Sequence, residues 1–198
     1  MNKKFRNTLF ITFLSSVGLI IAFSIFTYSN INDLIHDQEM VSHTNEVLYN
    51  MEQIVSEIRE AENMQRGYLL TSNEDFLNEY WGGRERTQNR FDEVKRLSGD
   101  NVLQQLRLDT LNQLLKKRFD LLDERTRLGI LPPRDPIGIN LVMEGMNAME
   151  KISDVVKRMK EHENDLLKHR STEARSSSED AYLIAGVFTV LTILIIIT

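Results

Sequence analysis

Four histidines are the side chains best suited to bind a metal ion or to respond to pH. They form two pairs with a spacing of seven, His36 with His43 and His162 with His169. Imidazole is a ligand of zinc and nickel and titrates near neutral pH. Two histidines seven residues apart on one helix are separated by about 10.5 Å and cannot share a metal. A metal site therefore needs one histidine from each pair, and we predict His43 with His169. The alternative is that all four are solvated.

Four arginines form a second group, Arg66 and the three that follow the glycine pair at 82–83, namely Arg84, Arg86 and Arg90. Guanidinium groups bind carboxylates and phosphates through paired hydrogen bonds. The group therefore predicts an anion or ligand site at one end of a helical domain. The alternative is that these arginines lie solvated on helix surfaces.

The chain lacks the sequence patterns of common catalytic and nucleotide-binding sites. It contains no G-x-G-x-x-G, no Walker motif, no G-x-S-x-G and no H-E-x-x-H. It also has no cysteine, so disulfides cannot stabilise it. We therefore expect a chain that is not an enzyme and that carries no cofactor.

Two uncharged apolar runs bracket the sequence, one from Asn7 to Asn32 and one from Ala181 to Thr198. The second has 18 residues and would reach about 27 Å as a helix, nearly the thickness of a bilayer core. Three basic residues and no acidic one precede the first run. The positive-inside rule then places the N-terminus in the cytoplasm and the middle of the chain outside it.

We predict four segments: a cytoplasmic N-terminus at 1–7, a transmembrane helix at 8–28, an extracytoplasmic helical domain at 29–181, and a second transmembrane helix at 182–198. A cleaved signal peptide is disfavoured because no Ala-x-Ala-like site lies near Tyr28. No Lys or Arg follows the second run, although a natural span normally emerges into the cytoplasm beside such residues. We therefore expect a longer parent protein with a cytoplasmic output domain. The central segment carries 29 acidic and 21 basic residues, a net charge of −8, which argues against nucleic acid as a partner.

Three breaks divide the central segment into four helices. They are Thr71-Ser72-Asn73, with a helix cap at Ser72 or Asn73; Ser98-Gly99-Asp100, with Gly99 as a C-terminal cap and Asp100 or Asn101 opening the next helix; and the loop Gly129 to Gly138 with Pro132, Pro133 and Pro136. The helices run to about Leu70, over 74–97, over 102–128, and from about Ile137. Apolar residues recur in each with helical period, for example at Leu34, Val41, Leu48 and Val55.

The predicted fold is all-α, an antiparallel up-down four-helix bundle whose two long outer helices continue into the transmembrane helices. At about 1.5 Å per residue the outer helices reach some 65 Å and the inner pair about 40 Å. The excess forms a two-helix stem, roughly Ser29 to Val47 against Glu163 to Asp180, with Ser29 level with Ala181. Because this stem is polar, we expect a homodimer that doubles it into four helices.

The string Arg66-Gly67-Tyr68-Leu69-Leu70-Thr71, followed by Phe76-Leu77 and Tyr80, resembles the signature of the type-three CHASE domain. That family is an extracytoplasmic helical sensor between two membrane spans of bacterial receptors, and the resemblance covers about residues 30 to 180. Read physically, Gly67 allows a neighbouring helix to approach, Tyr68 and Leu69 fill the distal core, and Phe76, Leu77 and Tyr80 pack over them. The sequence departs from the usual pattern at Trp81-Gly82-Gly83, where two helical glycines cost about 1 kcal/mol each and weaken the expectation of a straight helix.

The resemblance implies a signal-input module in the lipid bilayer of the bacterial inner membrane, with its central domain periplasmic or extracellular. It would sense a small-molecule or protein ligand and act on a cytoplasmic output domain, most often a histidine kinase with its response regulator. Displacement of the fourth helix relative to the first would carry the signal through the stem. Two alternatives remain: an input domain for a chemoreceptor or nucleotide cyclase, and a membrane-anchored bundle that binds a partner protein without signalling output.

Overall fold

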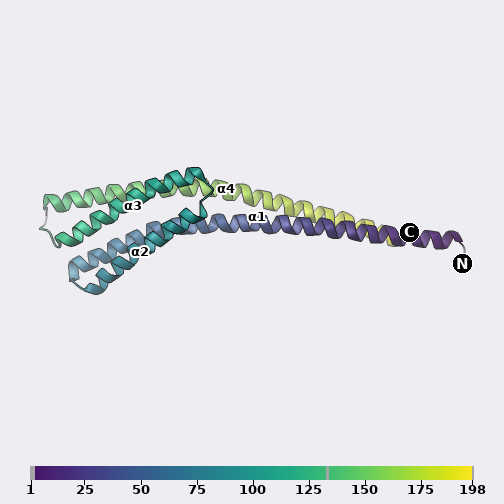
Figure 1. Ribbon diagram of the computed structural model, residues 1–198, viewed down its shortest axis with the longest axis horizontal. Coiled ribbons are helices and arrows are strands. Elements are labelled where there is room, and N and C mark those ends of the chain that lie inside the picture. Colours follow the sequence, from purple (N-terminus) through teal and green to yellow (C-terminus); the bar gives the residue numbers. More distant parts are fainter. Residues whose placement is uncertain (1–2, 133, 198) are drawn as a thin grey trace. The chain divides into compact units, whose positions relative to one another are not determined.

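The computed structural model describes residues 3–132 and 134–197. This part of the chain contains four helices and no strand: α1 (Lys3–Thr71), α2 (Glu74–Leu97), α3 (Val102–Leu128) and α4 (Pro136–Ile197) (Figure 1). The all-α prediction is confirmed, with every compared helix end within one residue of the predicted position. Pro133 of the predicted loop, and Met1, Asn2 and Thr198 of the predicted terminal segments, lie outside the described residues.

Polar caps set where the three later helices begin. The Asn73 side chain accepts a hydrogen bond from the Asp75 backbone N–H at 2.9 Å, and the Asn101 side chain accepts one from Gln104 N–H at 3.1 Å. Each satisfies a backbone donor that the first helical turn leaves free. Asn73 and Asn101 are thus the caps among the predicted alternatives.

Two of the sequence-based boundaries were wrong in detail. Asp135 accepts hydrogen bonds from the N–H groups of Ile137 at 2.9 Å and Gly138 at 3.0 Å, so α4 begins at Pro136 and Gly138 is helical rather than part of the loop. Proline suits the first helical position because its missing N–H would have no partner there. The residue that ends α2 is Ser98, whose N–H donates to Val94 O at 2.9 Å, and not Gly99.

The chain divides into two compact units, residues 43–166 and residues 1–42 with 167–198. We call the first unit the bundle and the second the helix pair. The bundle holds α2, α3 and the adjoining segments of α1 and α4, whereas the helix pair holds the remaining segments of α1 and α4.

The bundle has one apolar core to which all four helices contribute. On α1 its members alternate in steps of four and three, at Val47, Met51, Ile54, Ile58 and Ala61. This is the spacing of a coiled-coil-like seam. The predicted stripe through Leu48 and Val55 has the same period of seven but lies one position further on, and these two residues are only half-buried. The face that packs into the core is the one that carries Val47, Ile54 and Ala61. An ion pair between Lys160 of α4 and Glu52 of α1 lies outside this core.

Two glycines permit close contacts between α1 and α2. A Cβ added at Gly67 would lie 2.8 Å from a ring carbon of Phe76, and one added at Gly83 would lie 3.0 Å from Cβ of Ala61. Both distances are shorter than ordinary van der Waals contact. The glycines at 82–83 leave α2 unbroken, and Gly83 serves packing rather than bending.

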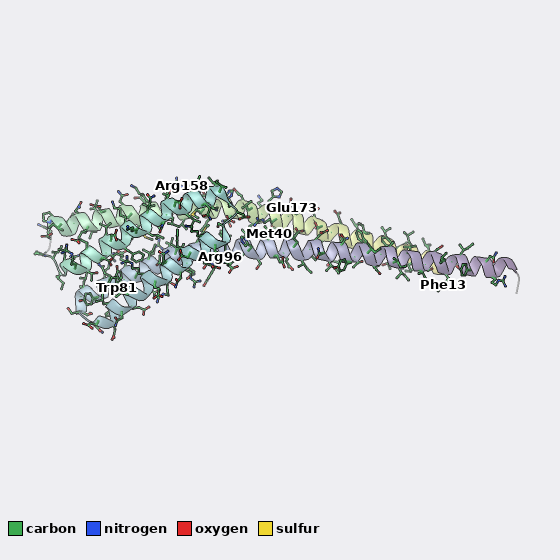
Figure 2. All side chains as sticks on the ribbon, viewed as in Figure 1. Phe13, Met40, Trp81, Arg96, Arg158 and Glu173 are labelled. Atoms are coloured by element: carbon green, nitrogen blue, oxygen red, sulfur yellow. The ribbon has the colours of Figure 1, made fainter. Side chains whose placement is uncertain are left out.

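The helix pair turns large apolar side chains outward. Phe13, labelled in Figure 2, is 66% exposed. Ile25 is 67% exposed. The pair is joined by Phe23 and Phe188, whose ring centroids lie 5.2 Å apart, and by Arg170, whose Nη1 donates to Met40 O at 3.4 Å. The Arg170 contact matches the register predicted from Ser29 and Ala181. Both α1 and α4 contain a stretch long and apolar enough to cross a membrane.

Candidate ligand site

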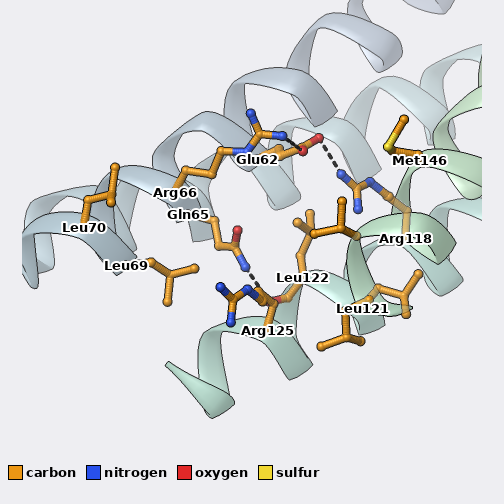
Figure 3. A pocket seen from close by; sticks show the side chains of 12 residues that line it. Glu62, Gln65, Arg66, Leu69, Leu70, Arg118, Leu121, Leu122, Arg125 and Met146 are labelled. Atoms are coloured by element: carbon orange, nitrogen blue, oxygen red, sulfur yellow. Dashed lines mark hydrogen bonds and ion pairs between the residues drawn. The ribbon is translucent and has the colours of Figure 1, made fainter. Parts of the chain in front are cut away.

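A cavity of about 380 Å³ lies in the bundle between α1, α3 and α4 (Figure 3). Its volume falls within the usual range for small-molecule sites, about 300 to 1,000 Å³. Most of the wall is aliphatic, and the polar part is three arginines, one glutamate and one glutamine. The lining residues are Glu62, Gln65, Arg66, Leu69 and Leu70 of α1, Arg118, Leu121, Leu122 and Arg125 of α3, and Leu141, Val142 and Met146 of α4.

Arg118 is the charged side chain buried deepest in this wall, with 5% of its surface exposed. Its Nη2 forms an ion pair with Glu62 across the gap between α3 and α1 (Figure 3). Its Nε is also buried and has no hydrogen-bond partner among the described residues. A buried donor without a partner costs about 1–3 kcal/mol, more for a charged group. The Nε–H of Arg118 is therefore a donor that a ligand with an acceptor oxygen could satisfy.

Gly145 of α4 makes room for the Arg118 guanidinium. A Cβ added at Gly145 would overlap Nη1 of Arg118. The guanidinium therefore lies against α4 while it holds a carboxylate of α1. Arg118 of α3 is in this way in contact with both α1 and α4.

The charges around the cavity are unbalanced. Glu62 pairs with both Arg118 and Arg66, so one carboxylate is shared by two guanidinium groups. A third guanidinium, that of Arg125, donates to Gly129 O at 2.8 Å. The lining thus carries three positive charges against one negative charge, which favours an anionic ligand.

Gln65 holds α1 against α3 beside the cavity. Its side chain is buried, and its Nε2 donates to Leu122 O at 2.8 Å and to Thr126 Oγ1 at 3.3 Å. Figure 3 shows this contact on the same side of the cavity as Leu69 and Arg125. The contact fixes the spacing of the two helices at this level.

Of the four arginines predicted as an anion-binding group, only Arg66 lines the cavity. The other three are held by different partners elsewhere in the bundle. Hydrogen bonding to Glu57, and then to Glu79, raises the pKa of Arg86. The observed pairs are Arg84 with Asp123 at 2.6 Å, Arg86 with Glu57 at 2.7 Å and Glu79 at 2.9 Å, and Arg90 with Asn50 at 3.1 Å. A joint anion site of the four stays a prediction.

The signature residues lie at the end of the bundle formed by the α1–α2 turn, with different degrees of burial. Tyr80 is fully buried, and its hydroxyl donates to Asp123 of α3. Burial, and then the hydrogen bond to Asp123, raise the pKa of Tyr80. The others are half-buried or exposed: Tyr68, Leu69, Phe76 and Leu77 are half-buried, and Leu70, Thr71 and Arg66 are exposed. Leu69 faces the cavity.

The predicted histidine pair belongs to two different units, His43 to the bundle and His169 to the helix pair. Nδ1 of His43 is buried without a hydrogen-bond partner among the described residues, and Nδ1 of His169 lies 3.5 Å from Glu173 on its own helix. Within the described ranges no group of three or more His, Cys, Asp or Glu residues is placed to hold a metal. A metal site at the two histidines stays a prediction.

The family model of the CHASE3 domain matches residues 37–173 of the chain. The chain belongs to the CHASE3 domain family. The predicted resemblance to the type-three CHASE domain is thereby confirmed. The CHASE3 domain is also similar to the crystal structure of the sensor domain of the histidine kinase HK9 of Rhodopseudomonas palustris, with a TM-score of 0.56 and 26% identity over 63% of this chain and 98% of that one. No curated protein matches the chain.

Membership in the CHASE3 family identifies the chain as a sensory input module, a type of domain that is typically not catalytic. The two candidate spans beside the CHASE3 domain mark it as a membrane protein. The cavity between α1, α3 and α4 lies within the matched residues.

Sequence reasoning missed Arg118 and Glu62. A signal for Arg118 exists, since it follows Leu108, Leu111 and Leu115 in the core spacing of α3. A charged residue in a core position requires a partner. Periodicity counted over apolar residues alone passes over it, and helix periodicity does not show that the partner is Glu62.

Proposed function

We propose that this chain is the signal-input part of a bacterial receptor that regulates a cytoplasmic histidine kinase in a two-component system. The observation that carries the proposal is the similarity to the sensor domain of a histidine kinase over 98% of that domain, at 26% identity. The CHASE3 match and the two candidate spans support the same assignment.

The proposed topology follows the charges near the first span. Residues 1–7 lie in the cytoplasm, 8–28 and 182–198 cross the inner membrane, and 29–181 lie in the periplasm or outside the cell. Lys3, Lys4 and Arg6 precede the first span without an acidic residue, which supports this orientation.

Transmission is proposed to use α1 and α4, since both continue from the bundle into the helix pair as unbroken helices. A ligand shifts such an element only if it binds one packing of the helices more tightly than the other. The polar stem, with its exposed side chains, is the segment proposed to have two packings, and a homodimer is proposed to pair two stems.

The test is phosphorylation in inner-membrane vesicles that contain the protein encoded by the whole gene. With labelled ATP, a histidine is expected to become labelled and to pass the phosphoryl group to a response regulator. Leu34 lines a groove formed by residues of α1 and α4 in the helix pair, and its neighbour Ile35 is not among the lining residues. Leu34→Ser should shift basal labelling several-fold, and the matched control Ile35→Ser should shift it less. The absence of phosphohistidine would contradict the kinase assignment and favour a chemoreceptor, a cyclase or a membrane anchor.

A further inference from the structure

We propose that the cavity between α1, α3 and α4 binds an organic carboxylate with an apolar body, and that Arg118 holds its carboxylate group. The inference rests on the proposed function, because it names the class of ligand that the sensory module takes.

The need for an anion follows from Arg118. Arg118 is buried, with 5% of its surface exposed, and its guanidinium shares its carboxylate partner, Glu62, with Arg66. Its Nε has no partner among the residues that the structure describes. A buried cation is stable only when it is paired and its donors are satisfied. An incoming carboxylate supplies the missing acceptor.

The need for an apolar body follows from the rest of the wall. Leu69, Leu121, Leu122, Leu141 and Met146 offer no hydrogen bonds to a ligand through their side chains. Inorganic phosphate would bury oxygens against them without partners, and that is unfavourable. A carboxylate has two oxygens, which match the planar fork of one guanidinium. The apolar remainder of the ligand then covers the leucines.

Binding would change the contact between α1 and α3. A ligand carboxylate competes with Glu62 for Arg118, and Glu62 retains Arg66 on its own helix. Arg118 also lies against Gly145 of α4. The ligand therefore acts on a side chain that contacts both α1 and α4, the two helices that continue into the helix pair.

The test is calorimetric titration of the purified full chain in lipid nanodiscs. The probes are benzoate and hexanoate, with benzamide and hexanamide as neutral analogues of the same shape, and inorganic phosphate. At least one carboxylate is expected to bind at least ten-fold more tightly than its amide, and phosphate is expected not to bind.

Two substitutions and one control locate the site. Arg118→Gln should weaken carboxylate binding at least ten-fold, because it removes the positive charge. Val142→Trp should do the same by filling the cavity from its half-exposed α4 wall. Arg127→Gln is the control, since Arg127 is an exposed residue of α3 that pairs with Glu124 and is not part of the lining. It should bind within two-fold of the unmodified chain.

The inference is overturned if amides bind as tightly as the acids, if no carboxylate binds, or if binding survives Val142→Trp. The last outcome decides even if Arg118→Gln fails to fold. Phosphorylation that responds to Leu34→Ser, together with no binding of either carboxylate, would refute the ligand class and leave the proposed function intact.

Discussion

The helices α1 and α4 run through both the bundle and the helix pair, but they bury large apolar side chains in the bundle and expose such side chains in the helix pair. In the bundle segment of α1, Ile54 and Ile58 are completely buried, whereas in the helix-pair segment Phe13 and Ile25 are mostly exposed. The first segment has one apolar stripe with charged residues around it, whereas the second contains the uncharged run from Asn7 to Asn32, which is apolar on all sides. One continuous helix is thus suited to water along one part and to lipid along the other.

Charged side chains of the bundle and hydroxyl side chains of the two apolar runs also differ in where they find partners. Charged groups of the bundle pair across helices, as Arg118 does with Glu62 and Arg86 with Glu57. In the helix pair, Ser24 donates to Ile20 O and Thr189 to Ala185 O, both at 2.8 Å within their own helices. A hydrogen bond made within the helix leaves no donor facing hydrocarbon.

The largest difference is expected between truncation of a buried isoleucine in the bundle and truncation of an exposed one in the helix pair. Ile58→Ala should lower the free energy of unfolding of the bundle by about 2–5 kcal/mol, because it leaves a cavity in the core. Ile25→Ala, the same change in the helix pair, should leave the unfolding of the bundle unchanged. Urea titration followed by circular dichroism in nanodiscs measures both. Equal losses of unfolding free energy in the two variants would contradict the view that Ile58 lies in a water-excluding core and Ile25 on a lipid-facing surface.

An arginine placed in the proposed first membrane span, or on the surface of the bundle, tests whether residues 8–28 cross the membrane. Leu14→Arg should make insertion of the first span less favourable by about 2.5–3.5 kcal/mol. Leu106→Arg is the matched control, since Leu106 is about as exposed as Leu14 but lies on α3 in the bundle. It should leave both insertion and folding unchanged. Translation into membrane vesicles with a glycosylation reporter measures insertion, and equal insertion of the two variants counts against a span at 8–28.

Alanine substitutions at Gly82 and Gly83 of α2 distinguish the effect of helix packing from the effect of helix propensity. Gly83→Ala should destabilise the bundle by about 1–3 kcal/mol, because the new Cβ would lie 3.0 Å from Cβ of Ala61. Gly82→Ala meets only the flexible end of Arg86 at 3.2 Å and should stabilise by up to about 1 kcal/mol. Thermal unfolding distinguishes the two, and destabilisation by both variants would show that the pair is needed for another reason.

The smallest expected effect concerns pH. The pKa of Tyr80 in the folded bundle is raised above its ordinary value of 10.0. The folded state then keeps a proton that the unfolded state loses, so the stability from Tyr80 is complete below pH 10 and declines as pH rises above it. The difference in unfolding free energy between the unmodified chain and Tyr80→Phe should therefore narrow above pH 10. Urea titrations of both proteins at pH 8 and pH 11 measure this difference. The same difference at both pH values would show that the pKa of Tyr80 is not raised in the folded bundle.

The helix boundaries were predictable from sequence because they depend on local chemistry. Asn73 and Asn101 cap helices with their own side chains. Pro136 carries a local signal too, because proline suits the first helical turn, but the prediction placed it in the preceding loop. These signals involve residues within a few positions of one another, so no knowledge of the tertiary structure is needed.

The cavity was not predictable in the same way. Its central pair, Glu62 and Arg118, is 56 residues apart and lies on different helices. Gly83 looked like a local cost because its benefit, the contact with Ala61, comes from another helix. Arg84, Arg86 and Arg90 were predicted to bind one anion together because they are close in sequence. Each instead pairs with a residue of a neighbouring helix, and helix packing determines which one.

The ion pair of Lys160 with Glu52 joins side chains that are 108 residues apart. Contacts between α4 and α1 can therefore form only late in synthesis, after the residues between them have been made. Because a chain emerges from the ribosome N-terminus first, α1, α2 and α3 can associate while translation continues. The cavity wall contributed by Leu141 and Met146 is made afterwards. A newly made chain thus exposes the leucines of α1 and α3 until α4 arrives, and the ligand site is among the last parts of the bundle to be completed.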